Sequence, residues 1–253
     1  MRPALIPRST SDSMAETSSD TELILTIPVG RKGKYRWAQF DDYLHKARRN
    51  FEWKVPSRLS LTARCSNPHH DGTWGFGFWN DPFNTSLGIG GSVRRFPALP
   101  NCAWFFYASE HNYLSFHDYL PAQGYLAATF SSPRIPPAIL AFGIPFFPLL
   151  LWKGFTRIAR HALQALIRQD AAQIDVDVTA WHNYQIDWQQ NKVTFLVDSK
   201  VLLETRVAPH GRQGLVIWVD NQYAAYPPDG DLIFGTLASS KSTTLEIKDL
   251  MIT

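Results

Sequence analysis

The chain has 253 residues, of which 45% are hydrophobic and 13% aromatic, and its formal net charge is +3. This composition can build a large core, and so small a net charge gives no electrostatic reason to expect a nucleic-acid partner. Two cysteines, Cys65 and Cys102, are too few for a disulfide framework. Each lies in an apolar run, which predicts two buried thiols, with one bridge between them as the alternative.

Residues 1–22 are polar and lack the apolar core of a signal peptide. They are therefore predicted to form a disordered tail before a single domain over residues 23–253. Cytoplasmic residence is the default expectation for such an N-terminus.

Short segments of alternating polarity follow one another from residue 23 to residue 130. The predicted strands are Leu23–Val29, Tyr35–Leu44, Leu59–Cys65, Gly72–Trp79, Ala103–Tyr107, Tyr113–His117 and Tyr125–Phe130. In the segment from Gly72 to Trp79, Trp74 lies on the same strand face as Phe76 and Phe78. Gly75 and Gly77 leave the opposite face bare, which permits close approach of another backbone or a ligand. The spacing of these strands is typical of a β-sandwich.

Residues 134–170 interrupt the strand pattern. The run RIPPAILAFGIPFFPLLLWKGF is strongly apolar, but its four prolines exclude a regular transmembrane helix. From Gly154 to Gln169 apolar residues recur at helical spacing, with arginines elsewhere on the wheel, which predicts a basic amphipathic helix. We expect its apolar side to pack on its own domain. The alternatives are a peripheral membrane contact through 134–170 and a lid over an apolar cavity.

The stretch from Trp181 to Gln222 has the most specific pattern of the chain. Tyr184, Ile186 and Trp188 share one face of a predicted strand. Val193, Phe195 and Val197 share one face of the following strand. A polar turn over 189–192 joins them, a second turn over 198–200 leads to Val201–Leu203, and a late apolar strand ends at Asp220–Asn221.

This order resembles the closing half of the glycoside hydrolase family 16 jelly roll, a concanavalin A-like sandwich. The upstream passage LSLTARCSNPHHDGTWGFGFWNDP and the C-terminal TTLEIKDLMIT also resemble parts of that family. The resemblance implies an all-β jelly roll of two antiparallel sheets, with a ligand cleft on the concave face of one sheet. The apolar loop and helix of residues 134–170 would be an insertion into it.

Retaining enzymes of the family carry Glu-x-Asp-x-(x)-Glu on one strand of the concave face, because their mechanism needs two carboxylates about 5–5.5 Å apart. The corresponding strand here, Cys102–Tyr107, contains no carboxylate. Asp175 and Asp177 also alternate with Gln173, but the exposed face of an edge strand explains them. The sequence therefore does not support the standard retaining mechanism. The groups that could act as displaced catalytic residues are Glu110, Asp81, Asp220 and His117.

The resemblance also implies which residues line the cleft. The candidate ligand-binding residues are Trp74, Trp79, Asn80, Trp104, Phe106, Trp218, Asn221 and Tyr223. No cofactor and no catalytic metal is expected, and Asp249 is the one candidate for a structural calcium site. Three functions stay open: binding of a saccharide or an apolar small molecule without hydrolysis, glycosidase activity with displaced acids, and cyclase or isomerase activity on an apolar metabolite.

Overall fold

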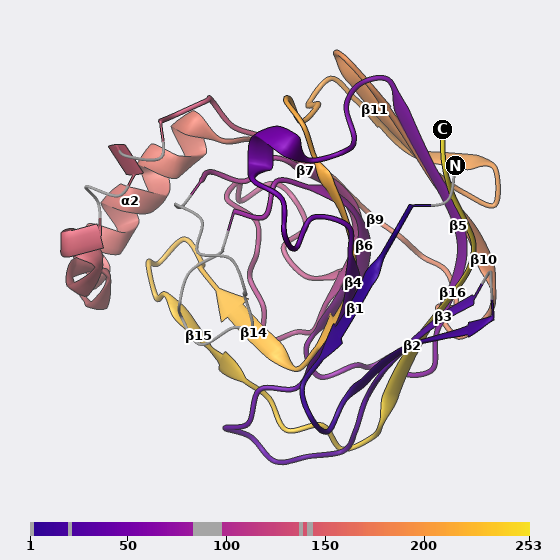
Figure 1. Ribbon diagram of the computed structural model, residues 1–253. Helices are drawn as coiled ribbons and strands as arrows, with labels where there is room; N and C mark the ends of the chain where they lie inside the picture. Colours follow the sequence, from indigo (N-terminus) through magenta and orange to yellow (C-terminus); the bar gives the residue numbers. More distant parts are fainter. Residues whose placement is uncertain (1–2, 20–21, 83–97, 137–138, 141–143) are drawn as a thin grey trace.

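The computed structural model describes residues 3–19, 22–82, 98–136, 139–140 and 144–253. It contains two seven-stranded antiparallel sheets that pack face to face (Figure 1). The first sheet has the order β1 (Ile6–Ser9), β4 (Trp37–Asp41), β13 (Gly214–Asp220), β6 (Thr73–Trp79), β7 (Cys102–Ala108), β8 (Gly124–Ser131), β9 (Arg168–Gln173). The second sheet has the order β12 (Lys200–Thr205), β11 (Lys192–Val197), β10 (His182–Gln189), β5 (Ser57–Cys65), β16 (Thr243–Ile252), β3 (Glu22–Ile27), β2 (Met14–Ser19). This is the predicted all-β jelly-roll sandwich.

The core lies between the two sheets and takes one face from each. In the first sheet Phe76 pairs with Ile217 and with Phe105, and all three side chains are fully buried. From the second sheet Trp188 packs on Phe78, with ring centroids 5.4 Å apart. Because strand residues alternate between faces, the other face of the first sheet is turned away from the core. This face, called the site face below, corresponds to the predicted concave face.

The hairpin predicted between residues 181 and 203 is confirmed. Tyr184 pairs with Val197 and Trp188 with Val193 across β10 and β11, and Gln189 pairs with Lys192 at the turn. The apolar residues of both strands are buried because they form the inner face of the second sheet. The two predicted buried thiols are confirmed as well, since Cys65 and Cys102 are both free and buried.

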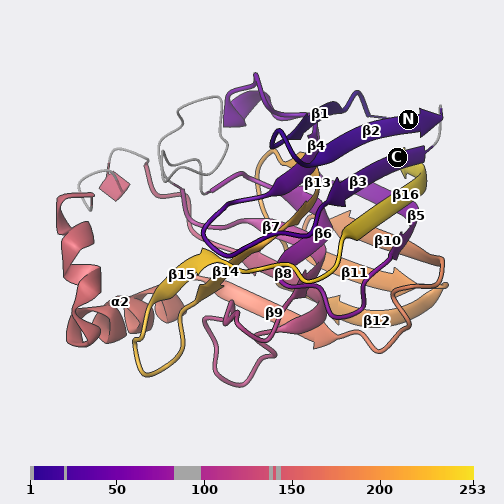
Figure 2. The ribbon, with the colours of Figure 1, turned by 90° about the horizontal axis from the view of Figure 1, so that it is seen from below.

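Two local predictions are wrong. The segment 6–19 is not a disordered tail, because β1 pairs with β4 and β2 pairs with β3 at the edges of the two sheets (Figure 2). Edge strands are paired on one side only and need little apolar alternation, so a polar sequence does not identify them as strands. The segment 113–117 is not a strand but a loop, in which Tyr113 alone bridges to Ala225. This loop is held to β9 by Gln169, whose Oε1 accepts from the Phe116 N–H at 2.9 Å.

The insertion forms a 3-10 helix, η2 (Ile144–Leu151), and the helix α2 (Lys153–Leu166), so the predicted helix ends before Arg168 begins β9. No helix among the described residues is long and apolar enough to cross a membrane. The expected packing of the apolar side of α2 on its own domain holds only in part, because Leu163 and the following Ile167 pack on an apolar cluster of the first sheet whereas other apolar residues of the helix are exposed. The buried residues of α2 are Thr156 and Arg160, whereas Ile158 is 67% exposed. A two-stranded hairpin, β14 (Gln222–Ala225) and β15 (Ile233–Thr236), lies on the same side of the molecule as α2 (Figure 2).

A candidate binding site on the first sheet

The site face combines glycines on β6 with large aromatic residues on the neighbouring strands. A Cβ atom at Gly75 would lie 2.7 Å from Cη2 of Trp218, and one at Gly77 would lie 2.6 Å from Cβ of Trp104. The face of β6 that the sequence leaves bare is therefore occupied by side chains from β13 and β7. This confirms that the glycines allow close approach of another backbone, because the Phe105 and Ala103 carbonyl oxygens of β7 would each lie 2.4 Å from such a Cβ atom, with the Trp218 indole also close to Gly75.

Four aromatic side chains form one continuous surface on the site face, which we call the aromatic platform: Trp79, Trp104, Phe106 and Trp218. Trp104 lies at its centre, with ring centroids 5.9 Å from Trp79, 5.6 Å from Phe106 and 5.5 Å from Trp218. The three indoles are partly exposed. Among the described residues the buried Nε1 of Trp104 has no hydrogen-bond partner. The platform thus offers aromatic faces.

A short hydrogen-bonded chain joins the platform to a buried carboxyl. Trp218 donates from Nε1 to Thr73 Oγ1 at 2.9 Å, and Thr73 donates to Oδ1 of Asp220 at 2.9 Å. Tyr35 donates its hydroxyl to Oδ2 of Asp220 at 3.4 Å, and the Gln222 N–H donates to Oδ1. Burial raises the pKa of the Asp220 carboxyl to about 6, and these hydrogen bonds oppose the rise only in part. Asp220 is therefore a polar group at one end of the platform.

A second buried carboxylate lies at the opposite end of the site face and was not among the predicted site residues. Asp41 on β4 accepts from Arg8 Nε at 2.9 Å and from Gln39 Nε2 at 2.9 Å. It pairs with Val216 of β13, whereas Asp220 is four residues further along the same strand. At the rise of a β-strand this is a separation of about 13 Å along the sheet. Catalytic carboxyl pairs of inverting and retaining glycosidases are at most about 9.5 Å apart, so the two acids are too distant to act as such a pair.

The alternation of Trp37, Gln39 and Asp41 in the predicted strand 35–44 could have revealed Asp41. These three residues share a face opposite to the buried Ala38 and Phe40. What the sequence does not show is the partner, because Arg8 lies in the segment predicted to be disordered.

Several candidate ligand-binding residues are used by the fold itself. Trp74 lies in the core between the sheets, stacked on Tyr107 at 5.7 Å, so its placement in the cleft wall is wrong. Asn80 donates to the Leu99 carbonyl and accepts from the Asn101 N–H, which holds the two chain segments together. The fully buried Asn221 similarly donates to the carbonyls of residues 34 and 237 and accepts from the N–H of residue 36.

The remaining candidate groups lie away from the platform. Asp81, in a turn with φ +48°, and Glu110, exposed in the turn after β7, are at opposite ends of the sheet because β6 and β7 are antiparallel. His117 approaches the Ile167 carbonyl with its Nε2 at 3.0 Å, in the loop over β9. Tyr223 is on β14, with its ring 6.3 Å from that of His111. The structure therefore brings Trp79, Trp104, Phe106, Trp218 and Asp220 together and separates them from the other candidates.

The candidate calcium position lies on the second sheet. Asp249 has φ +55° at an irregularity of β16, and Thr62 Oγ1 approaches its Oδ2 at 3.5 Å. Within the described part of the chain no three residues of the types His, Cys, Asp and Glu form a group that could hold a metal ion. A structural calcium at Asp249 stays an untested prediction.

The buried Asp220 carboxyl should impose a pH dependence on stability. Its pKa of about 6 in the folded protein exceeds the unfolded value of about 3.9, so the folded state binds more protons between about pH 4 and 6. The free energy of unfolding must then fall as pH rises through this window. We expect Asp220→Asn to match the wild type near pH 4 and to be about 2 kcal/mol more stable near pH 7.

Urea unfolding across pH 4–7 measures this difference. Burial also raises the pKa of Asp42 to about 6. Asp42→Asn therefore removes a second carboxyl that titrates in the same pH range, and its stability is measured beside that of Asp220→Asn. Parallel stability profiles for the wild type and Asp220→Asn would show that Asp220 does not titrate in this range.

Comparison with known proteins agrees with this geometry. The family model described as glycosyl hydrolases family 16 matches residues 164–213. The fold is similar to that of LamAcat from Zobellia galactanivorans, with a TM-score of 0.50 and 12% sequence identity over 92% of this chain and 78% of that chain. It is equally similar to a family 16 protein of the Bacteroides ovatus mixed linkage glucan PUL, solved with a G4G4G3G product. That match has a TM-score of 0.50 and 11% identity over 98% of this chain and 94% of that chain.

At identities this low the two solved structures establish the fold alone. No protein of curated function matches the chain in sequence. The family match covers the end of α2, β9 and the hairpin of β10 and β11 with the strand after it, and so includes residues 181–213 of the stretch whose pattern is most specific in the sequence. The protein therefore has a jelly-roll sandwich of two antiparallel sheets similar to that of the two solved structures, and its residues 164–213 are similar to glycoside hydrolase family 16.

Proposed function

We propose that the protein binds a saccharide on the aromatic platform and does not hydrolyse it by the two-carboxylate mechanism of family 16. One observation carries this proposal: the residues of β7 on the site face are Cys102, Trp104, Phe106 and Ala108. A retaining enzyme needs alternating carboxylates on such a strand, whereas this strand supplies aromatic rings. Aromatic rings at the positions where a retaining enzyme has its carboxylates favour ligand binding over hydrolysis.

The chemistry of the site face supports a saccharide as the ligand. Sugars present apolar C–H faces and polar edges, and binding sites for such molecules combine aromatic side chains with a few placed polar groups. Here the partly exposed rings of Trp104 and Trp218 lie beside the Thr73 hydroxyl and the Asp220 carboxyl. The structurally similar Bacteroides ovatus protein was solved with an oligosaccharide product.

An apolar small molecule is the second candidate ligand. The platform continues onto β8 and β9 through Leu126, Ala128, Phe130 and Ala171, all buried. The surroundings of the platform in this direction are apolar, which suits an apolar ligand, and a cyclase or isomerase acting on such a ligand would need Asp220 as its acid. The exposed apolar side of α2 adds nothing to this surface, which is why we place the saccharide first.

Thermal shift distinguishes the two ligand classes. We expect mixed-linkage glucans or related β-glycans to raise Tm, because a ligand that binds only the folded state stabilises it by mass action. The panel should include β-glucans, galactans and lipophilic metabolites. Stabilisation by lipophilic metabolites alone would overturn the saccharide proposal in favour of the second candidate.

Trp104 is the residue whose loss should weaken binding most. Trp104→Ala is expected to lower the affinity for a stabilising glycan at least about tenfold, which corresponds to about 1.4 kcal/mol of lost stacking. Trp104→Phe keeps a ring but removes the N–H, and its loss of affinity should be smaller than that of Trp104→Ala. Isothermal titration calorimetry on folded variants gives both values.

Trp181→Ala is the matched control for this series. Trp181 is also partly exposed, but its ring lies against Arg64 and Lys248 beside the second sheet. Its removal should leave affinity unchanged. An equal loss in Trp104→Ala and Trp181→Ala would mean that the platform is not the binding site.

A further inference from the structure

The helix α2 is amphipathic, yet it packs on the protein through its polar side. Arg160 is 2% exposed and donates from Nη1 to the carbonyls of Ser115 and Tyr226 and from Nη2 to Oδ1 of Asp118. Its charge is therefore satisfied by three separate acceptors from two loops. A buried arginine so extensively hydrogen-bonded fixes which side of a helix faces inward.

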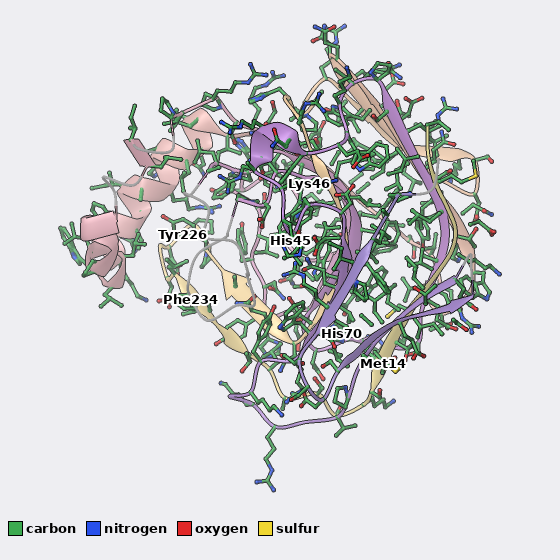
Figure 3. All side chains as sticks on the ribbon, in the orientation of Figure 1. Met14, His45, Lys46, His70, Tyr226 and Phe234 are labelled. Carbon is green, nitrogen blue, oxygen red and sulfur yellow. The ribbon has the colours of Figure 1, made fainter. Side chains whose placement is uncertain are left out.

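Other polar residues on the same side of α2 strengthen this orientation. Thr156 donates its hydroxyl to the Gly230 carbonyl, and the Tyr226 hydroxyl donates to the Thr156 carbonyl. Gln164 donates to the Phe116 carbonyl at 2.7 Å. Figure 3 shows Tyr226 on the side of the molecule that carries α2. Turning the helix over would leave all these groups without partners, so the polar side stays inside.

The opposite side of α2 and the end of η2 expose large apolar side chains. We call this set the exposed apolar surface: Leu149 (41% exposed), Leu151 (91%), Trp152 (64%), Ile158 (67%) and Leu166 (42%). With Ile139, these account for six of the thirteen exposed large hydrophobic side chains in the described residues. Such a concentration on one short segment is unlike the scattered apolar residues of an ordinary protein surface and indicates an interaction site.

The exposed side of this segment carries cations beside its apolar residues. Residues 118–170 contain five arginines and lysines and two aspartates. Arg160 pairs with Asp118 at 2.5 Å and Lys153 with Asp231 at 3.1 Å, so Arg157 is the cation of α2 that no ion pair among the described residues neutralises. Lys153, Arg157 and His161 follow one another along α2 at helical spacing beside the apolar residues, and all three are exposed. The aliphatic parts of Lys153 and Arg157 can extend so that their charged ends lie at the edge of an apolar contact.

We propose that the exposed apolar surface docks on the face of an anionic lipid bilayer. An amphipathic helix lies in the plane of the interface with its apolar side in the acyl boundary and its cations at the headgroups. Trp152 fits the headgroup level, where tryptophan is enriched, and Ile158 and Leu166 lie about two and about four helical turns further along the exposed side. Each cation near an anionic surface adds about 1 kcal/mol of attraction.

This surface is separate from the aromatic platform, and its function does not depend on saccharide binding. The two lie close together, because Leu163 and Ile167 at the end of α2 pack against the apolar cluster that contains Trp104 and Phe106. Docking would therefore hold the site face beside the membrane.

Vesicle co-sedimentation of the full chain tests the proposal. The protein is incubated with vesicles of phosphatidylcholine alone and with vesicles that also contain about 25% phosphatidylglycerol, which gives them a negative surface potential. We expect binding to the anionic vesicles that weakens as salt rises, and at least about tenfold weaker binding of Ile158→Asp and of Trp152→Asp. The substituted side chains are exposed, so circular dichroism and Tm should stay as in the wild type.

Val201→Asp and Met251→Asp are the matched controls. Both side chains are about half exposed, 52% and 50%, and both belong to the second sheet. They should bind vesicles as the wild type does. The proposal is overturned if the wild type binds neither kind of vesicle, or if the controls lose binding as much as Ile158→Asp. It is also overturned if sedimentation shows a dimer that Ile158→Asp converts to a monomer, because a second copy would then cover this surface.

Discussion

Replacement of Arg160 by leucine is expected to destabilise the protein by about 3 kcal/mol, although the substitution makes α2 more apolar. The guanidinium is buried and hydrogen-bonded to the Ser115 and Tyr226 carbonyls and to Asp118, so its removal leaves two carbonyls without their donor, while the 53% exposed Asp118 carboxylate can turn to water. Each buried acceptor that loses its partner costs about 1–3 kcal/mol. Chemical unfolding of the wild type and Arg160→Leu measures the difference directly.

The neighbouring Arg157 provides the control for this substitution. It is exposed, and its Nε donates to the Asp229 carbonyl at the surface. Arg157→Leu should cost less than about 1 kcal/mol, because exposed hydrogen bonds and charges contribute little. Equal destabilisation by both variants would contradict the polar-side packing of α2, and with it the argument that the exposed apolar surface faces outward.

Gly77→Ala is expected to destabilise the fold by about 3 kcal/mol and to abolish ligand binding on the platform. A Cβ atom at residue 77 would lie 2.4 Å from the Ala103 carbonyl oxygen and 2.5 Å from Cα of Trp104. Backbone atoms of a central strand cannot move aside cheaply, so β6 and β7 must separate and Trp104 must shift. Unfolding experiments give the stability, and calorimetry of the folded fraction gives the binding.

Gly33→Ala is the appropriate control. Gly33 has φ +93°, but a Cβ atom there meets no other atom within 4 Å. Only backbone strain then opposes the substitution, at a cost of about 1 kcal/mol, and the site is untouched. If Gly77→Ala were no more destabilising than Gly33→Ala, the close approach of the Trp104 strand to β6 would be wrong.

The inner strands could be predicted from the sequence because each is paired with a strand on both sides and buries one face in the core. Alternation such as that of Tyr184, Ile186 and Trp188 exists only when one face of a strand packs in a core. Strands β1 and β2 could not be found in this way. They lie at the sheet edges, where half of the hydrogen bonds and most side chains meet solvent, and a polar sequence such as MAETSS is compatible with that position.

The site could be predicted only up to the strand register. The sequence places Trp74 and Trp79 on opposite faces of one strand but does not say which face is buried. The structure assigns Trp74 to the core and Trp79 to the site face. Asn80 and Asn221 are equally ambiguous in a sequence, because an amide that closes a loop and an amide that binds a ligand have the same chemistry.

The helix shows a different limit. Its period was predicted correctly, but the side that packs inward was predicted only in part, because Thr156 and Arg160 are buried and Ile158 is exposed. Arg160 reverses the orientation because the loops at 115–118 and 226 converge on it as acceptors. That convergence depends on chain segments more than 40 residues away in sequence and leaves no local signal.

The central claim is that the family 16-like sandwich binds a saccharide without cleaving it. The measurement that tests it most directly combines calorimetry with assay of reducing ends, on the same sample of protein and mixed-linkage glucan oligosaccharides. We predict a heat of binding that Trp104→Ala removes, and no new reducing ends after prolonged incubation. Release of reducing ends by the wild type that is lost in Asp220→Asn or Glu110→Gln would contradict the claim and establish a glycosidase with displaced acids.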